Sequence, residues 1–123
     1  MTRTLIAAAL ALALAPAARA ATVTVPGEVL MVPLDVATVT TAGVPVNALI
    51  AGHRTAGGWI VNPATATAPL CINEYGPASA TAADGASTCI LPGNRFPLSP
   101  SPRPLSVVSS DAAHPFTGAG YTE

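Results

Sequence analysis

The chain has 123 residues, of which 50% are hydrophobic and only 9% are charged, and its formal net charge is −1. Charge this sparse offers no basic patch for phosphate groups, so nucleic acids and anionic membranes are poor partners. Two cysteines and two histidines leave little material for a metal centre.

The first twenty residues predict a secretory signal peptide. Arg3 supplies a positive start, residues 5–15 form an unbroken apolar run, and residues 18–20 (Ala-Arg-Ala) are a small-x-small cleavage site. The run is too short for a membrane span, which takes about 20 apolar residues. We therefore expect residues 1–20 to be removed. Residues 21–123 should then work as one domain in the periplasm, at the cell surface or outside the cell, with no stable membrane anchor.

The spacing of proline and glycine nearly excludes helices from this domain. Beyond residue 20 the longest stretch free of both is 105–114, whereas an average helix has about 11–12 residues. The intervening residues are rich in Val, Thr and Ile, whose branched side chains favour strands. At most one helical turn fits, near 78–84. Strands are expected at 22–25, 29–32, 36–41, 44–50, 59–62, 70–73, 88–91, 95–98, 105–109 and 116–122.

Short strands at this spacing predict an all-β fold, a small single-domain β-sandwich or barrel of about eight antiparallel strands. In the strand at 44–50, simple alternation places the even-numbered residues on one face and the odd-numbered residues on the other. The Ser-Pro-Ser-Pro-Arg-Pro segment at 99–104 should be extended, polyproline-like and exposed. Open sheet edges make assembly with other chains a reasonable expectation.

Cys71 and Cys89 are expected to form a disulfide. Two cysteines in an exported chain, with no thiol left over, most often pair. They fall in two neighbouring predicted strands, so an antiparallel hairpin would bring them together. Closing a loop of this length contributes about 3 kcal/mol in the chain-entropy model.

Catalytic and metal-binding residue types gather only near the end of the chain. Ser109, Ser110, Asp111 and His114 include a nucleophile, an acid and a base, but adjacency in sequence is not the geometry of a triad, so we assign no catalytic residue. Asp111 and His114 could offer two metal ligands, joined by His53 or Glu74, although a catalytic zinc takes three protein ligands. The sequence predicts no cofactor and leaves these residues as the basis of an alternative.

Trp59 is the single tryptophan and follows two glycines. In a lean core one large aromatic side chain covers much apolar area, so a core-filling role is expected. An exposed Trp59 would instead indicate contact with a carbohydrate or a partner, which makes it a candidate binding residue.

Four segments resemble small β-sandwich virion accessory proteins of phages and prophages. They are Gly-Gly-Trp-Ile-Val-Asn-Pro from residue 57, Leu-Cys-Ile-Asn-Glu-Tyr-Gly-Pro-Ala from residue 70, Leu-Pro-Gly-Asn-Arg-Phe-Pro-Leu from residue 91 and Leu-Ser-Val-Val-Ser-Ser-Asp-Ala-Ala-His-Pro-Phe-Thr-Gly from residue 105. The resemblance covers about two thirds of the domain. It implies a structural or attachment role and carries no catalytic residues across.

These observations predict a non-enzymatic, exported structural or binding module of the cell envelope or surface that binds a protein partner or assembles with itself. The resemblance implies a phage origin for it. The alternative is a small periplasmic metal-binding protein or enzyme that uses His114, Asp111 and His53.

Overall fold

The computed structural model describes residues 28–123, which contain ten β-strands and no helix. Accordingly, none of these residues forms a helix long and apolar enough to cross a membrane. The predicted signal peptide and the strand expected at 22–25 lie outside the described residues. The strands are β1 (Leu30–Pro33), β2 (Thr38–Val39), β3 (Val46–Leu49), β4 (Gly58–Val61), β5 (Leu70–Asn73), β6 (Thr88–Ile90), β7 (Arg95–Leu98), β8 (Leu105–Ser109), β9 (His114–Pro115) and β10 (Thr117–Thr122).

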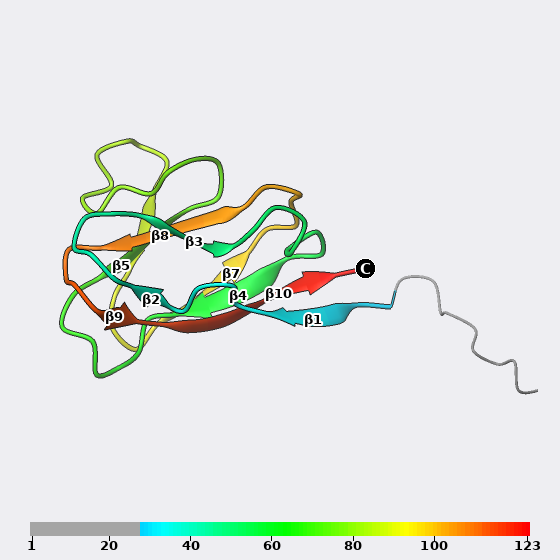
Figure 1. Ribbon diagram of the computed structural model, residues 1–123, viewed down its shortest axis with the longest axis horizontal. Coiled ribbons are helices and arrows are strands. Elements are labelled where there is room, and N and C mark those ends of the chain that lie inside the picture. Colours follow the sequence, from blue (N-terminus) through cyan, green and yellow to red (C-terminus); the bar gives the residue numbers. More distant parts are fainter. Residues whose placement is uncertain (1–27) are drawn as a thin grey trace, which may run out of the picture.

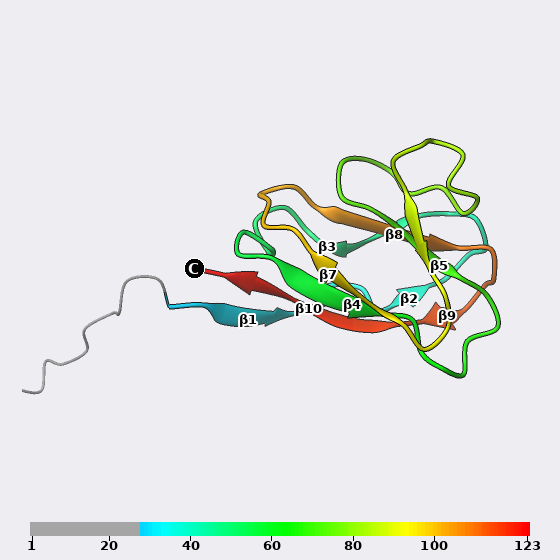
Figure 2. The same cartoon turned by 180° about the vertical axis from the view of Figure 1, so that it is seen from behind.

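Two four-stranded antiparallel sheets face each other (Figures 1 and 2). One has the strand order β1-β10-β4-β7, the other has the order β3-β8-β5-β6, and β2 and β9 form a separate pair at one end. The prediction of a small all-β domain with antiparallel strands is therefore confirmed, and the arrangement is that of a β-sandwich. The structure has ten strands where about eight were predicted, and the two-residue strand β9 is the one that no predicted strand covers.

Aliphatic side chains from both large sheets meet in one core. Ile60 and Leu98 of the first sheet share a buried cluster with Leu70, Ile72 and Leu105 of the second. Fully burying such a side chain contributes about 1.5–3 kcal/mol, so this cluster is the main source of stability.

The second sheet is covered on both faces. Every residue of β5 and β8 is buried. One face joins the core, and on the other Ala78, from the loop between β5 and β6, packs with Cys71 and Val108. This loop, residues 74–87, is the yellow-green segment in Figure 1. Burial on both faces explains why these two strands lack the polar alternation of a half-exposed strand.

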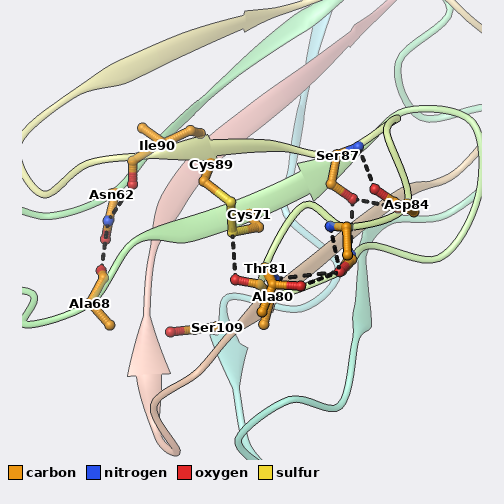
Figure 3. Close-up of a disulfide and its surroundings, with 12 residues drawn as sticks. Asn62, Ala68, Cys71, Ala80, Thr81, Asp84, Ser87, Cys89, Ile90 and Ser109 are labelled. Carbon is orange, nitrogen blue, oxygen red and sulfur yellow. Dashed lines mark hydrogen bonds between the residues drawn. A yellow bond between two sulfur atoms is a disulfide. The ribbon is translucent and has the colours of Figure 1, made fainter.

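Cys71 and Cys89 lie directly opposite each other in β5 and β6 and form a disulfide (Figure 3). The predicted hairpin and its pairing are confirmed. The bridge closes the base of the 74–87 loop, whose interior is hydrogen-bonded. Asp84 accepts the hydroxyl and the amide of Ser87, and these bonds hold the pKa of Asp84 below its usual value.

Two predicted strands differ from the structure by more than one residue at an end. In β3 the register shifts between Asn47 and Leu49, so Ala48 and Leu49 are both buried and the predicted alternation is wrong there. A bulge of this kind turns a strand locally and breaks its two-residue period. The strand expected at 36–41 shrinks to the two residues of β2, and the carbonyls of Ala37 and Thr40 on either side of it accept the amides of Phe116 and Ala113.

β1 is the least protected strand edge of the described residues. It is an outer strand of its sheet, and Val29, Leu30 and Met31 are 50%, 55% and 68% exposed. The opposite edge of the same sheet, β7, carries Arg95 and Pro97, which discourage pairing with another chain. β1 carries no charge and its single proline, Pro33, is its last residue, so the apolar edge at Leu30 and Met31 is open to further pairing.

Candidate binding groove and buried polar clusters

A chain of hydrogen bonds connects Ser109 at the end of β8, His114 in β9 and Asn62 just after β4. Ser109 Oγ lies 3.0 Å from His114 Nδ1, and His114 Nε2 lies 2.8 Å from Asn62 Oδ1. The Asn62 amide nitrogen donates to the carbonyls of Ala68 and Ile90, as Figure 3 shows. All three side chains are buried, so the network ties the two large sheets and β9 together from inside.

The network fixes which nitrogen of the neutral His114 ring carries the hydrogen. Because the Asn62 nitrogen donates to two carbonyls, its oxygen must accept a hydrogen from His114 Nε2. Nδ1 of the neutral ring then accepts the Ser109 hydroxyl, whose oxygen accepts the amide of Asp111. Burial lowers the pKa of His114, and the negative charge of Asp111 opposes this shift without cancelling it.

Ser109, His114 and Asn62 are the residue types of a nucleophile, a base and an orienting group, at hydrogen-bonding distances. Ser109 is 0% and His114 is 3% exposed, however, so a substrate has no access to them in this conformation. The Asp111 carboxylate bonds to the Thr67 hydroxyl at 2.6 Å and not to the histidine ring. Of the residues considered from the sequence, Ser109 and His114 therefore meet in a buried hydrogen-bond network, which Asp111 joins only through its backbone amide.

His53 belongs to a separate, surface cluster. Its Nδ1 lies 2.9 Å from Asp35 Oδ2, which also accepts the amide of Ile50 at 2.8 Å. Burial alone would raise the pKa of Asp35, but the Ile50 amide and the His53 ring outweigh it and lower the pKa. The dyad connects the turn after β1 to the loop after β3.

The metal ligands considered from sequence are not assembled. His53 pairs with Asp35, both ring nitrogens of His114 are hydrogen-bonded, and Glu74 pairs with Arg54. Within residues 28–123, no three His, Cys, Asp or Glu side chains gather as metal binding requires. The alternative based on His114, Asp111 and His53 thus lacks a ligand set among these residues.

Trp59 does not fill the core, and that expectation is wrong. Alternation along β4 places Ile60 in the core and Trp59 on the opposite, outer face, where it is half-buried. The Arg95 guanidinium of the neighbouring β7 lies 4.7 Å from the centroid of the indole ring. Such an exposed cation–π contact contributes about 0.5–1 kcal/mol.

Arg54 is the largest fully buried side chain within residues 28–123. Its five N–H groups are directed to five acceptors. Nε donates to the carbonyl of Arg103, Nη1 donates to the carbonyl of Ser99 and to Glu74 Oε1, and Nη2 donates to the carbonyls of Glu74 and Pro104. Burial lowers the pKa of Arg54 while Glu74 raises it, and the guanidinium remains charged.

This single side chain holds two surface segments in place. One is the proline-rich segment 99–104, which is largely exposed as predicted but bends at Pro102 and Arg103 and so is not extended throughout. The other begins at Glu74 after β5. The second segment is fixed further by Asn73, whose side chain accepts the amide of Tyr75 and donates to the carbonyl of Pro77. Neither segment is free to move without breaking buried hydrogen bonds.

Between these two segments lies a groove of about 370 Å³, within the range of small-ligand sites. We call it the Tyr75–Arg103 groove. Tyr75 is 70% exposed, and the Ser106 hydroxyl at the groove accepts the amide of Ala78 and can still donate its own hydrogen. The groove is lined by Pro45 and Asn47 around the start of β3, by Tyr75, Gly76 and Pro77 after β5, and by Arg103, Pro104 and Ser106 around the start of β8.

Sequence reasoning missed both Arg54 and the groove. The acceptors of Arg54 lie 20 to 50 residues away along the chain, so no local sequence pattern predicts them. The one signal in the sequence was the run of prolines at 99–104, since rigid, exposed segments often border binding sites.

No family model matches this chain, and neither the curated proteins nor the solved structures contain a match. A role for this protein must therefore be inferred from its own residues.

Proposed function

We propose that this protein is an exported, non-enzymatic binding module of the cell envelope or surface, and that the Tyr75–Arg103 groove is its binding site. The disulfide indicates an oxidising, exported environment. The predicted signal peptide supports the same location, and the resemblance to phage accessory proteins supports an attachment role.

The observation that carries the proposal is the buried Arg54. Removing a guanidinium from water is costly, and an apolar core residue would often serve stability as well or better. Here the charge fixes backbone carbonyls on both walls of the groove. Binding sites need walls held by such supporting contacts, so the arrangement favours recognition at this surface.

The test is retention of the exported protein on purified bacterial envelopes and on whole cells. We expect retention that Tyr75→Ala weakens and that Tyr121→Ala, on the other sheet, does not. Strong hydrolysis of ester, amide or glycosidic substrates that disappears in His114→Ala would overturn the proposal. Stoichiometric zinc or copper in protein purified without a histidine tag would favour the metal-binding alternative.

The open edge at β1 favours self-assembly as a second role. Pairing of β1 with β1 of a second copy would cover Leu30 and Met31 and continue the sheet. Sedimentation velocity over a range of concentrations tests this. Met31→Lys should shift the protein toward monomer, whereas Val44→Lys, 51% exposed in the native protein but away from β1, should not. A native protein that stays monomeric at millimolar concentration contradicts this role.

A further inference from the structure

We infer that the Tyr75–Arg103 groove binds an acidic saccharide, in which a sugar ring lies against Tyr75 and the prolines and its carboxylate meets Arg103. This inference rests on the proposed function, because it names the ligand of the same site. It follows from three features of the groove: its flat apolar surfaces, its uncompensated cation and its poor fit to a peptide strand.

The apolar surfaces suit a ring that is apolar on its face and polar at its rim. Tyr75 presents most of its ring to solvent, and Pro77 and Pro104 add rigid apolar faces. Polar groups sit beside them: the Asn47 amide offers both a donor and an acceptor, and the Ser106 hydroxyl offers a donor. A sugar places C–H groups on its faces and hydroxyls around its edge, which matches this pattern.

Arg103 supplies the preference for a negative charge. It makes no ion pair within residues 28–123, and its one side-chain hydrogen bond, to the Tyr75 carbonyl, is 3.5 Å long and therefore weak. Glu74 forms its ion pair with the buried Arg54 and none with Arg103. A guanidinium with unused donors matches a carboxylate in geometry as well as in charge.

An extended peptide fits this surface less well. Peptides commonly bind by adding a strand to a sheet edge through backbone hydrogen bonds. β3 is the edge strand beside the groove, but Pro45 has no amide hydrogen to offer, and the register shift after Asn47 interrupts the ladder. Recognition here must run through side chains, as it does for saccharides.

Calorimetric titration of the exported, disulfide-bonded protein with trigalacturonic acid tests the inference, with the methyl ester of the same trisaccharide as the matched neutral ligand. We expect the acid to bind at least about tenfold more tightly than the ester, and added salt to reduce the difference. Arg103→Gln should remove the preference, and it leaves in place the residue-103 carbonyl that Arg54 needs. Tyr75→Ala should weaken both ligands.

Arg95→Gln is the control, because Arg95 lies against Trp59 on the other sheet. Equal binding of the acid and the ester would overturn the role of charge, and acetate competing as well as the trisaccharide would overturn the role of the ring. If an acidic Gly-Glu repeat peptide binds in the groove and neither sugar does, the ligand class is wrong while the binding function stands. If the native protein is not retained on envelopes at all, the proposed function itself is refuted.

Discussion

Replacing Arg54 should destabilise the whole domain, although the residue borders a surface groove. Arg54→Met keeps much of the apolar stem but removes all five hydrogen bonds. Glu74, whose side chain is 13% exposed, is then left without its cation. The change is therefore the loss of one partner from a buried ion pair, which is the costly case.

The magnitude follows from this geometry. Breaking a buried pair costs about 3–5 kcal/mol, and the lower end applies because Glu74 still accepts the amide of Ser99. A loss of about 3 kcal/mol corresponds to a fall in Tm of roughly 12–24 °C for a domain of this size. Arg54→Lys keeps the charge but has three donors in place of five, so losing at least two hydrogen bonds should cost about 1–3 kcal/mol.

Urea unfolding with the disulfide intact measures these losses, and the fluorescence of the single tryptophan reports the transition. A double-mutant cycle with Glu74→Gln isolates the ion pair. We expect Arg54→Met and Glu74→Gln together to cost about 1–3 kcal/mol less than the sum of the single changes. Arg95→Met, which removes only the contact with Trp59, should cost about 1 kcal/mol or less.

Two results would refute this reasoning. The first is a loss below about 1 kcal/mol for Arg54→Met, because a buried and fully bonded guanidinium should not be dispensable. The second is strict additivity of Arg54→Met and Glu74→Gln, which would mean that the pair is not coupled. If Arg54→Met fails to fold, the comparison of Arg54→Lys with the control at Arg95 still decides.

Three further predictions concern other parts of the fold. Burial lowers the pKa of His114, so as the pH drops below about 6.5 the unfolded chain takes up a proton on this ring before the folded protein does, and the free energy of unfolding falls. His114→Gln should make the urea midpoint nearly independent of pH between about pH 5 and 7. A native protein whose midpoint is already independent of pH contradicts this. Cys71→Ser with Cys89→Ser should cost about 3 kcal/mol in urea unfolding, and two free thiols by mass spectrometry in protein from the periplasm would contradict the bridge itself. Gly120→Ala should lower Tm by at least several degrees, because a Cβ there meets the carbonyl of His53, and an unchanged Tm would show that the two backbones can separate freely.

Much of the fold was predictable because it depends on the spacing of prolines, glycines and apolar residues over short stretches of the chain. Proline and glycine excluded helices, and the strands at 70–73, 95–98 and 105–109 appear with the predicted bounds. The disulfide followed from the number of cysteines and from their placement in neighbouring strands. Where a strand departs from simple alternation, as β3 does at its bulge, the local pattern gave no warning.

The candidate site was far less predictable. Of the residues singled out for their chemistry, His53 lies in a separate surface pair with Asp35, and Asp111 joins the His114 network only through its backbone amide. Trp59 faces outward because its neighbour Ile60 takes the core position. The groove was not anticipated, since three distant segments form it and none of them has a motif.

The sequence by itself determined the strand composition, the sparse charge and the covalent bridge, because each depends on residue types or on short-range spacing. The tertiary structure decided the burial of Arg54 and His114 and the position of the Tyr75–Arg103 groove. The physical reason is that a charged or polar side chain is stable inside a protein only when partners surround it. Those partners come from distant parts of the chain, and only folding brings them together.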